Sequence, residues 1–300
     1  MWIVVIFALA GGLAQLVDGT LGMGFGVTSA TVLLFMGIAP VTASAATHAA
    51  KLPTTLISGL SHWREGNVDP GVLLRVALPG ALGGFLGAVV LTNISLASAK
   101  GWMSGLLIFF GVVIFARFGL GVRLIPVPQS GHTARCLSPI GLLGGFVDAT
   151  GGGGWGPVVT PSLMTVTRHE PRKVVGTVNA AEFVVAVSVS FGFLTGAAQH
   201  GIPWLPVAGL ALGGVVMAPV AARLAGRLPH APMGTMVGGL VVLVNSITIV
   251  DALGGLPGWI DAVLILLTVA VVGAVARVAW RRERDENAES TLAQDPADAG

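Results

Sequence analysis

Long apolar stretches separated by short polar or glycine-rich breaks run along most of the chain. We interpret this pattern as a series of helices, which cover residues 2–17, 24–37, 41–61, 71–92, 98–117, 137–149, 155–166, 173–199, 203–224, 231–250 and 257–280. Several of them approach the ~20 residues that a helix needs to cross a bilayer. The segments around Asp18 and Asp148 are shorter, and they predict either re-entrant half-helices or short full spans. The pattern therefore predicts an all-α polytopic membrane protein.

The chain contains the same unusual segment twice. LVDGTLGMGFG at residues 16–26 returns as FVDATGGGGWG at residues 146–156. Further on, PVTASAATHAAK at 40–51 aligns with PRKVVGTVNAAE at 171–182. A duplicated membrane unit with a glycine-broken segment at the same place in each half is typical of secondary transporters, and the breaks mark the binding site.

The number of crossings predicts how the two halves are oriented. Each half holds one glycine-broken pair and three spans, which is an odd number of crossings, so we predict inverted repeats. The predicted organisation is a first transmembrane repeat at 1–117, a cytoplasmic linker at 118–135, a second repeat at 136–250, a last transmembrane helix with a basic end at 251–284, and a disordered cytoplasmic tail at 285–300.

Basic residues predict the orientation in the membrane. If the segment containing Arg281, Arg282 and Arg284 is cytoplasmic, every Lys and Arg except Lys51 and Lys100 falls on the cytoplasmic side. The N-terminus is then outside and the C-terminus inside. We expect a multi-pass protein of the bacterial inner (cytoplasmic) membrane.

Composition supports a bilayer location and excludes other classes. Hydrophobic residues make up 54% of the chain and charged residues 10%, with a mean hydropathy of +0.86, whereas soluble domains carry about 25% charged residues. A single cysteine, Cys136, excludes an internal disulfide and a cysteine-cluster metal site. No Walker A lysine motif occurs, and the few loop arginines do not imply a nucleic-acid partner. We expect no cofactor and no metal.

Ionisable residues inside predicted spans are the first candidates for function, because a charge at a helix centre costs about 2.5–3.5 kcal/mol. The third predicted helix is unusual because its polar residues keep to one face, and these are Ser44, Thr47, His48, Lys51, Thr54, Thr55 and Ser58. Such a stripe faces protein or a water-filled cavity rather than lipid. Pro53 lies within it and is expected to kink the helix beside Lys51.

The glycine runs complete a candidate anion site. Backbone N–H groups of a glycine segment that opens a helix can approach an anion closely, and the helix dipole favours negative charge there. The predicted substrate-binding residues are Lys51, His48, Thr47, Gly22, Gly24, Gly26, Gly152, Gly153, Gly154 and Asn179. The predicted proton-coupling or structural residues are Asp18, Asp148 and Glu182.

Other interpretations of the same residues remain open. Lys51 and Glu182, which occupy equivalent repeat positions, could form a purely structural pair, and the two aspartates could cap the helices after the glycine runs. His48, Phe25 and Trp155 could serve packing, and the glycines could serve close helix crossing. A divalent-cation permease would use Asp18, His48, Asp148 and Glu182. An intramembrane enzyme would use the set Ser44, His48 and Asp18, and a structural subunit would use none of them.

The chain resembles the sulfite exporter TauE/SafE family of membrane permeases over nearly all of residues 5–280. The resemblance rests on Asp18-Gly19 with Gly22, Gly24 and Gly26, on Asp148 with Gly151 to Gly154, Gly156 and Pro161, on HWREGNVD at 62–69, on GGFLGA at 83–88 and on GGVVMA at 213–218. The resemblance implies export of sulfite or an organosulfonate such as sulfoacetate, coupled to the ion gradient.

Residues and resemblance together predict a secondary active transporter that exports a small anion in response to the proton gradient. Its expected partners are the anionic substrate, protons and the lipid bilayer, and a homodimer is a possible assembly.

Overall fold

The structure is a computed structural model, which describes residues 2–122, 133–167, 169–194, 201–225, 227–255 and 257–294. Within these residues it contains helices and no strand. The helices are α1 (Trp2–Leu21), α2 (Phe25–Phe35), α3 (Pro40–Arg64), α4 (Pro70–Asn93), α5 (Leu96–Gly119), α6 (Thr133–Gly151), α7 (Trp155–Val166), α8 (Pro171–Leu194), α9 (Trp204–Leu224), α10 (His230–Ala252) and α11 (Gly258–Gln294). The all-α prediction is confirmed.

The two glycine runs interrupt the helices where the sequence predicts a break. α1 ends at Leu21 and α2 begins at Phe25, and α6 ends at Gly151 before α7 begins at Trp155. Gly22 and Gly152 have φ of 71° and 74°, and Gly24 has φ of 150°. Glycine adopts these backbone conformations without the steric cost that a Cβ imposes. Each break is therefore encoded by its glycines.

The C-terminal end differs from the sequence expectation. α11 continues to Gln294, so residues 285–294 are helical rather than disordered. This segment contains Glu, Ala, Leu and Gln and no Gly or Pro, and Arg282 and Glu286 lie one turn apart with Nε and Oε1 at 3.9 Å. Residues 295–300 and most of the predicted linker, 123–132, lie outside the described residues.

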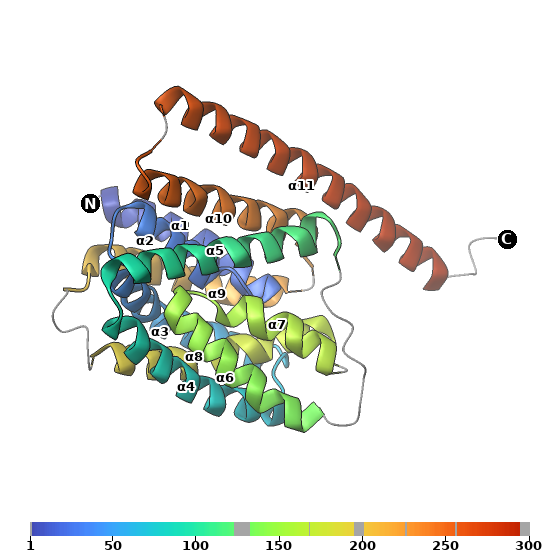
Figure 1. The fold of residues 1–300 in the computed structure, drawn as a ribbon. Helices are drawn as coiled ribbons and strands as arrows, with labels where there is room; N and C mark the ends of the chain where they lie inside the picture. The colour runs from blue at the N-terminus through green and yellow to red at the C-terminus, as the bar shows by residue number, and fades with distance from the viewer. Residues whose placement is uncertain are drawn as a thin grey trace.

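Helices from the two halves of the chain interleave. α1 packs along α9 and α6 packs along α4, while α3 packs against α8 and α5 against α10 (Figure 1). The sequence repeat relates α1 to α6, α3 to α8, α4 to α9 and α5 to α10. Exchanging each helix for its counterpart gives the same set of packed pairs. α11 lies at one edge of the bundle and extends away from it at its C-terminal end (Figure 1).

Glycines bring the paired helices into backbone contact. A Cβ at Gly83 or Gly145 would overlap the facing backbone at the α4–α6 crossing, and a Cβ at Gly11 or Gly213 would do the same at the α1–α9 crossing. Small residues at helix crossings are a common device of membrane proteins.

In the part of the chain that the structure describes, seven helices are long and apolar enough to cross a membrane: α1, α4, α5, α8, α9, α10 and α11. α3 has 25 residues but is not among them, because its polar stripe lowers its hydropathy. The site lies along this polar helix.

Candidate functional site

Buried charged side chains from three helices meet at Lys51. The Lys51 Nζ on α3 lies 2.8 Å from Asp148 Oδ1 on α6 and 2.8 Å from Glu182 Oε1 on α8. On α3, His48 Nε2 lies 3.0 Å from Asp148 Oδ2. All four residues are at most 3% exposed. The fold thus brings candidate residues from distant segments of the sequence into one cluster. The cluster is closed to solvent in this structure.

The polar stripe of α3 faces protein, as the sequence predicts. Its seven residues, Ser44 to Ser58, are each no more than 1% exposed. The helix continues through Pro53. Pairing of Lys51 with Glu182 was the structural alternative for these residues, and the ion pair is present. Lys51 nevertheless binds Asp148 at the same distance, so it is not a simple two-residue pair.

Both aspartates bind the start of the helix that follows their glycine break. The Phe25 backbone N–H donates to Asp18 Oδ1 over 3.2 Å, and the Trp155 backbone N–H donates to Asp148 Oδ1 over 3.1 Å. The spacing in sequence is the same in both cases, as the repeat requires. The two side chains differ in the contacts of their second carboxylate oxygen. Asp148 Oδ2 contacts His48, whereas Asp18 Oδ2 is buried without a hydrogen-bond partner.

The hydrogen bonds of His48 indicate its protonation. Its Nδ1 lies 2.8 Å from the Ser44 carbonyl oxygen, which can only accept, so Nδ1 carries a hydrogen. A neutral ring would then present a bare Nε2 lone pair to Asp148 Oδ2 at 3.0 Å. A proton must therefore lie between these two atoms. An imidazolium beside an ionised Asp148 and a neutral ring beside a protonated Asp148 both place a proton there, and the two arrangements have the same net charge.

Of the predicted binding residues, Asn179 and Thr47 take different positions. The Asn179 side chain is held by protein groups: its Nδ2 donates to Asp18 O over 3.4 Å and to Val175 O over 3.1 Å, and its Oδ1 accepts from Ser58 Oγ over 2.8 Å. Thr47 is fully buried, and its Oγ1 has no partner. Asn179 supports the Asp18 end of the site, and Thr47 leaves a hydroxyl available in the α3 stripe.

The two glycine segments touch each other beside Lys51. A Cβ at Gly26 would lie 2.5 Å from Gly153 Cα and 2.8 Å from Lys51 Nζ. A Cβ at Gly154 would lie 3.1 Å from the Asp148 backbone nitrogen, and one at Gly24 would lie 3.6 Å from that of Asp18. The glycines therefore permit close backbone crossing, and the crossing is at the charged cluster. Gly22 and Gly152 supply the turns described above.

Comparison with known proteins shows the family of the chain. The family model described as "Sulfite exporter TauE/SafE" matches residues 7–248 of the chain. The chain belongs to the sulfite exporter TauE/SafE family. The resemblance inferred from the sequence is confirmed, and the protein is a multi-pass membrane transporter.

Two curated relatives of this TauE/SafE chain come from Bacillus subtilis (strain 168). The "Probable membrane transporter protein YtnM" is 40% identical over 281 residues, which cover 88% of this chain and 92% of that protein. The "Probable membrane transporter protein YdhB" is 28% identical over 179 residues, which cover 59% of this chain and 72% of that protein. No solved structure matches the chain.

The cluster of this TauE/SafE transporter does not resemble a hydrolytic site. Ser44 Oγ donates to the Ala149 carbonyl oxygen over 2.7 Å, and His48 Nδ1 already carries a hydrogen, so His48 cannot accept the serine proton. His48 also contacts Asp148 instead of the Asp18 of the enzyme hypothesis. Within the described part of the chain, no three His, Cys, Asp or Glu residues are grouped to hold a metal ion.

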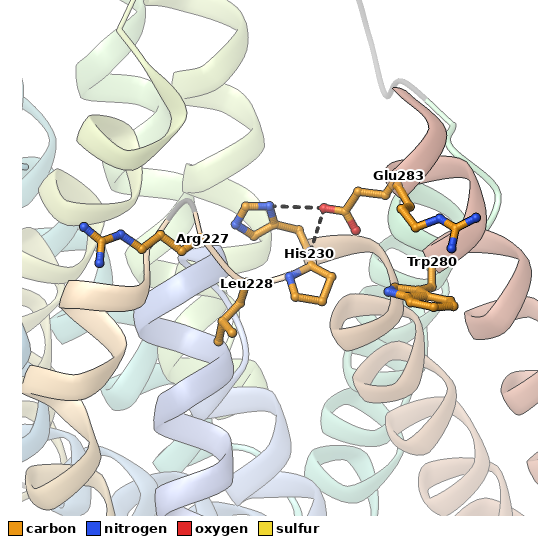
Figure 2. Close-up of a pocket in the computed structure, with 7 residues that line it drawn as sticks. Arg227, Leu228, His230, Trp280 and Glu283 are labelled. Carbon is orange, nitrogen blue, oxygen red and sulfur yellow. Dashed lines mark hydrogen bonds and ion pairs between the residues drawn. The ribbon is translucent and has the colours of Figure 1, made fainter. Parts of the chain in front are cut away.

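Two surface pockets lie where α10 begins. The larger, of about 310 Å³, lies between the start of α10 and the polar end of α11 (Figure 2). There the Glu283 carboxylate accepts hydrogen bonds from the His230 and Ala231 backbone N–H groups, over 2.8 and 2.9 Å, and so caps α10. The second pocket, of about 210 Å³, reaches the end of α1 and shares His230 with the first.

Sequence reasoning missed two polar features of the TauE/SafE transporter. Gln15 is fully buried and neither atom of its amide has a partner; its position three residues before Asp18, on the same helical face, was the available signal. Arg117 lines the second pocket. It had been counted only among the basic residues that set the orientation.

Proposed function

We propose that this TauE/SafE transporter is a secondary active exporter of a small anion, sulfite or an organosulfonate such as sulfoacetate, and that proton binding is coupled to anion binding. It would lie in the bacterial inner membrane with its N-terminus outside and its C-terminus in the cytoplasm. The observation that carries the proposal is the position of Lys51. It is the one Lys or Arg that is buried among the residues whose exposure the structure describes, and it lies where the two glycine segments cross.

An anion can reach Lys51 only if a carboxylate leaves it. In this closed structure the Lys51 ammonium group forms ion pairs with both Asp148 and Glu182. Asp148 is also bound by His48 and by the Trp155 N–H. Glu182 has fewer competing contacts, so Glu182 is the carboxylate that the anion replaces.

The charge of the buried cluster supports a coupled proton. Lys51 and the proton between His48 and Asp148 supply two positive charges, against three negative charges from the carboxylates of Asp18, Asp148 and Glu182. A net charge this deeply buried is unfavourable, so one proton on Asp18 or Glu182 would neutralise the cluster. The unpartnered Oδ2 of Asp18 is a place for it. Arrival of an anion at Lys51 frees Glu182, which then takes a further proton for the same reason.

This coupling is compatible with export. A doubly charged anion that travels with one proton still moves one net negative charge. The inside-negative membrane potential favours outward movement of that charge by about 2.3 kcal/mol per 100 mV. The two repeats, 1–117 and 136–250, would provide alternating access by rocking about the cluster, as inverted repeats do in other transporters.

The divalent-cation alternative has weaker support. Lys51 Nζ lies between Asp148 and Glu182, where a metal ion would have to bind, and its positive charge would oppose that ion.

Flux into proteoliposomes tests the proposal. Purified protein is reconstituted, and uptake of labelled sulfite, sulfoacetate, sulfate and nickel is measured with and without a pH gradient. We expect saturable sulfite or sulfoacetate flux that responds to the gradient, is absent in Lys51→Met and is retained in the control Lys100→Met. Nickel flux that persists in Lys51→Met and is lost in Asp148→Asn would instead establish the cation permease.

A further inference from the structure

The second pocket places two arginines beside the end of α1. We call it the basic pocket; it is lined by Thr20 and Leu21 of α1, Arg117 of α5, and Arg172 and Val175 of α8, among others. By the distribution of basic residues, it opens on the face that the sequence assigns to the cytoplasm.

The floor of the basic pocket is continuous with the Asp18 end of the site. Thr20 and Leu21 immediately precede the glycine break, and a Cβ at Gly22 would lie 3.3 Å from Val175 Cγ2. The Val175 carbonyl oxygen in turn accepts from Asn179, which also donates to Asp18 O. Only the glycine segment and one turn of α8 therefore separate the pocket from the buried charges.

Arg117 lacks an acidic partner. Its side chain is partly buried, yet no Asp or Glu of the described residues lies within ion-pair distance of it. Its contacts are Met164 Sδ, 2.8 Å from Nη2, and the ring of Phe118, whose centroid is 5.5 Å from Cζ. A partly desolvated cation without a counter-charge is unfavourable. In a pocket, such a cation is suited to bind an anion from solution.

Arg172 is available in the same pocket. Its Nε lies 2.7 Å from Glu170 Oε2, but both side chains are more than 60% exposed, and such surface pairs contribute little energy. A planar guanidinium matches the oxygen spacing of a sulfonate or sulfite better than a point charge does.

We propose that the basic pocket is the site through which the transported anion gains access to Lys51 from the cytoplasmic face, and that Arg117 is its main ligand, with Arg172 assisting. This inference rests on the proposed function. The anion binds first at Arg117 and Arg172. It passes to Lys51 when the Gly22 segment separates from Val175 and Thr160, which holds the Gly22 carbonyl oxygen through its hydroxyl group. The adjoining pocket in Figure 2 shares His230 with the basic pocket and is lined by Arg227 and Glu283 among others.

Side-specific kinetics test this assignment. Initial rates of sulfoacetate flux are measured from each face of oriented proteoliposomes for wild type, Arg117→Gln and the control Arg64→Gln, an exposed arginine of the same face. We expect Arg117→Gln to raise KM on the cytoplasmic face about tenfold, the loss of one charge-assisted contact, with kcat from that face and the opposite-face KM little changed. Because a substitution cannot alter the transport equilibrium, kcat from the opposite face should fall by the same factor. Arg64→Gln should match wild type. An Arg117→Gln KM equal to wild type on both faces would overturn the access site.

A labelling experiment tests the pocket independently of transport. In a Cys136→Ser background, Met164→Cys places a thiol beside Arg117. A negatively charged thiosulfonate should modify it faster than a positively charged one, and Arg117→Gln should remove that preference. Equal rates for both reagents would contradict the proposal even if Arg117→Gln failed to fold. Absence of all anion flux in wild type would instead refute the proposed function, whatever the labelling shows.

Discussion

The two aspartate ends of the site derive from the same repeated segment but have different surroundings. At one end, Asp148 is bound through both oxygens, by Lys51, His48 and the Trp155 N–H. At the other, Asp18 keeps only the bond from Phe25, and its Oδ2 has no partner. Both bind the start of the next helix in the same way. The shared contact therefore maintains the helix break, and the differences are where we look for transport chemistry.

The origin of the difference is visible in the repeat alignment. Lys51 and His48 of the first half align with Glu182 and Asn179 of the second. The residues that bind Asp148 are thus basic, whereas the aligned residues on α8 are an acid and an amide. Asp148 therefore has a basic partner at each carboxylate oxygen, whereas Asp18 Oδ2 has no hydrogen-bond partner. We interpret the first as the fixed anchor of the cluster and the second as the place of the proton that neutralises the closed cluster, whereas Glu182 takes the further proton that arrives with the anion.

Lys51→Met should have the largest effect, because it removes the one Lys or Arg that is buried among the residues whose exposure the structure describes. We expect flux of sulfite and sulfoacetate to fall to the level of empty liposomes. Removing one partner of a buried ion network costs about 3–5 kcal/mol, so we expect the variant to lose stability as well. The double variant Lys51→Met/Glu182→Gln removes the excess negative charge. If this double variant folds and still transports the anion at the wild-type rate, Lys51 is not the binding residue.

Neutralising each aspartate tests the comparison directly. Asp148→Asn leaves Lys51 and His48 without their shared carboxylate and should lower the free energy of unfolding by about 3–5 kcal/mol. Asp18→Asn retains the oxygen that accepts from Phe25 and should cost about 1 kcal/mol or less. Denaturant unfolding in detergent measures both. Equal losses would show that the two ends are equivalent and would remove the basis for assigning them different roles.

The glycine crossing can be tested with a matched pair of alanine substitutions. A Cβ at Gly153 would overlap the backbone of Gly26, whereas one at Gly101, in the exposed part of α5, would meet nothing within 4 Å. Gly153→Ala should destabilise the closed arrangement by about 1–3 kcal/mol, as overpacking does. Gly101→Ala should be neutral or slightly stabilising. Thermal unfolding would show the difference, and a harmless Gly153→Ala would mean that the crossing is looser than the structure has it.

Trp155→Phe should have a small effect on stability and none on anion binding. Trp155 is fully buried and its Nε1 donates to the Val178 carbonyl oxygen over 3.1 Å. Loss of that bond should cost about 1 kcal/mol and leave the anion KM unchanged. A large change in KM with normal stability would instead give Trp155 a direct role in substrate contact.

Much of the scaffold was predictable because it depends on local signals. Glycine runs after Asp18 and Asp148 encode breaks through positive φ, and the polar face of residues 44–58 has to be buried wherever the helix packs. The end of α11 was not predictable in the same way, because an acidic, alanine-containing segment is compatible with a helix as well as with a disordered tail.

The ion pairs of the site were only partly predictable. Alignment of the repeats placed Lys51 opposite Glu182, and these residues are in contact. It gave no indication that Asp148 would bind both Lys51 and His48, because this contact joins residues at unrelated repeat positions and depends on how α6 docks against α3. Arg117 was missed for a related reason, since its lack of an acidic partner is a property of the packed helices and not of its neighbours in sequence.

Calorimetric binding of sulfoacetate most directly tests whether the anion and a proton bind together at Lys51. Near neutral pH sulfoacetate is fully ionised, so any proton taken up goes to the protein. Titrations in two buffers of different ionisation enthalpy measure how many protons the protein takes up per anion bound. We predict uptake of about one proton per anion in wild type, weaker binding as pH rises, and binding without proton uptake in Glu182→Gln. Sulfoacetate binding that takes up no proton in wild type, or that persists unchanged in Lys51→Met, would contradict the account.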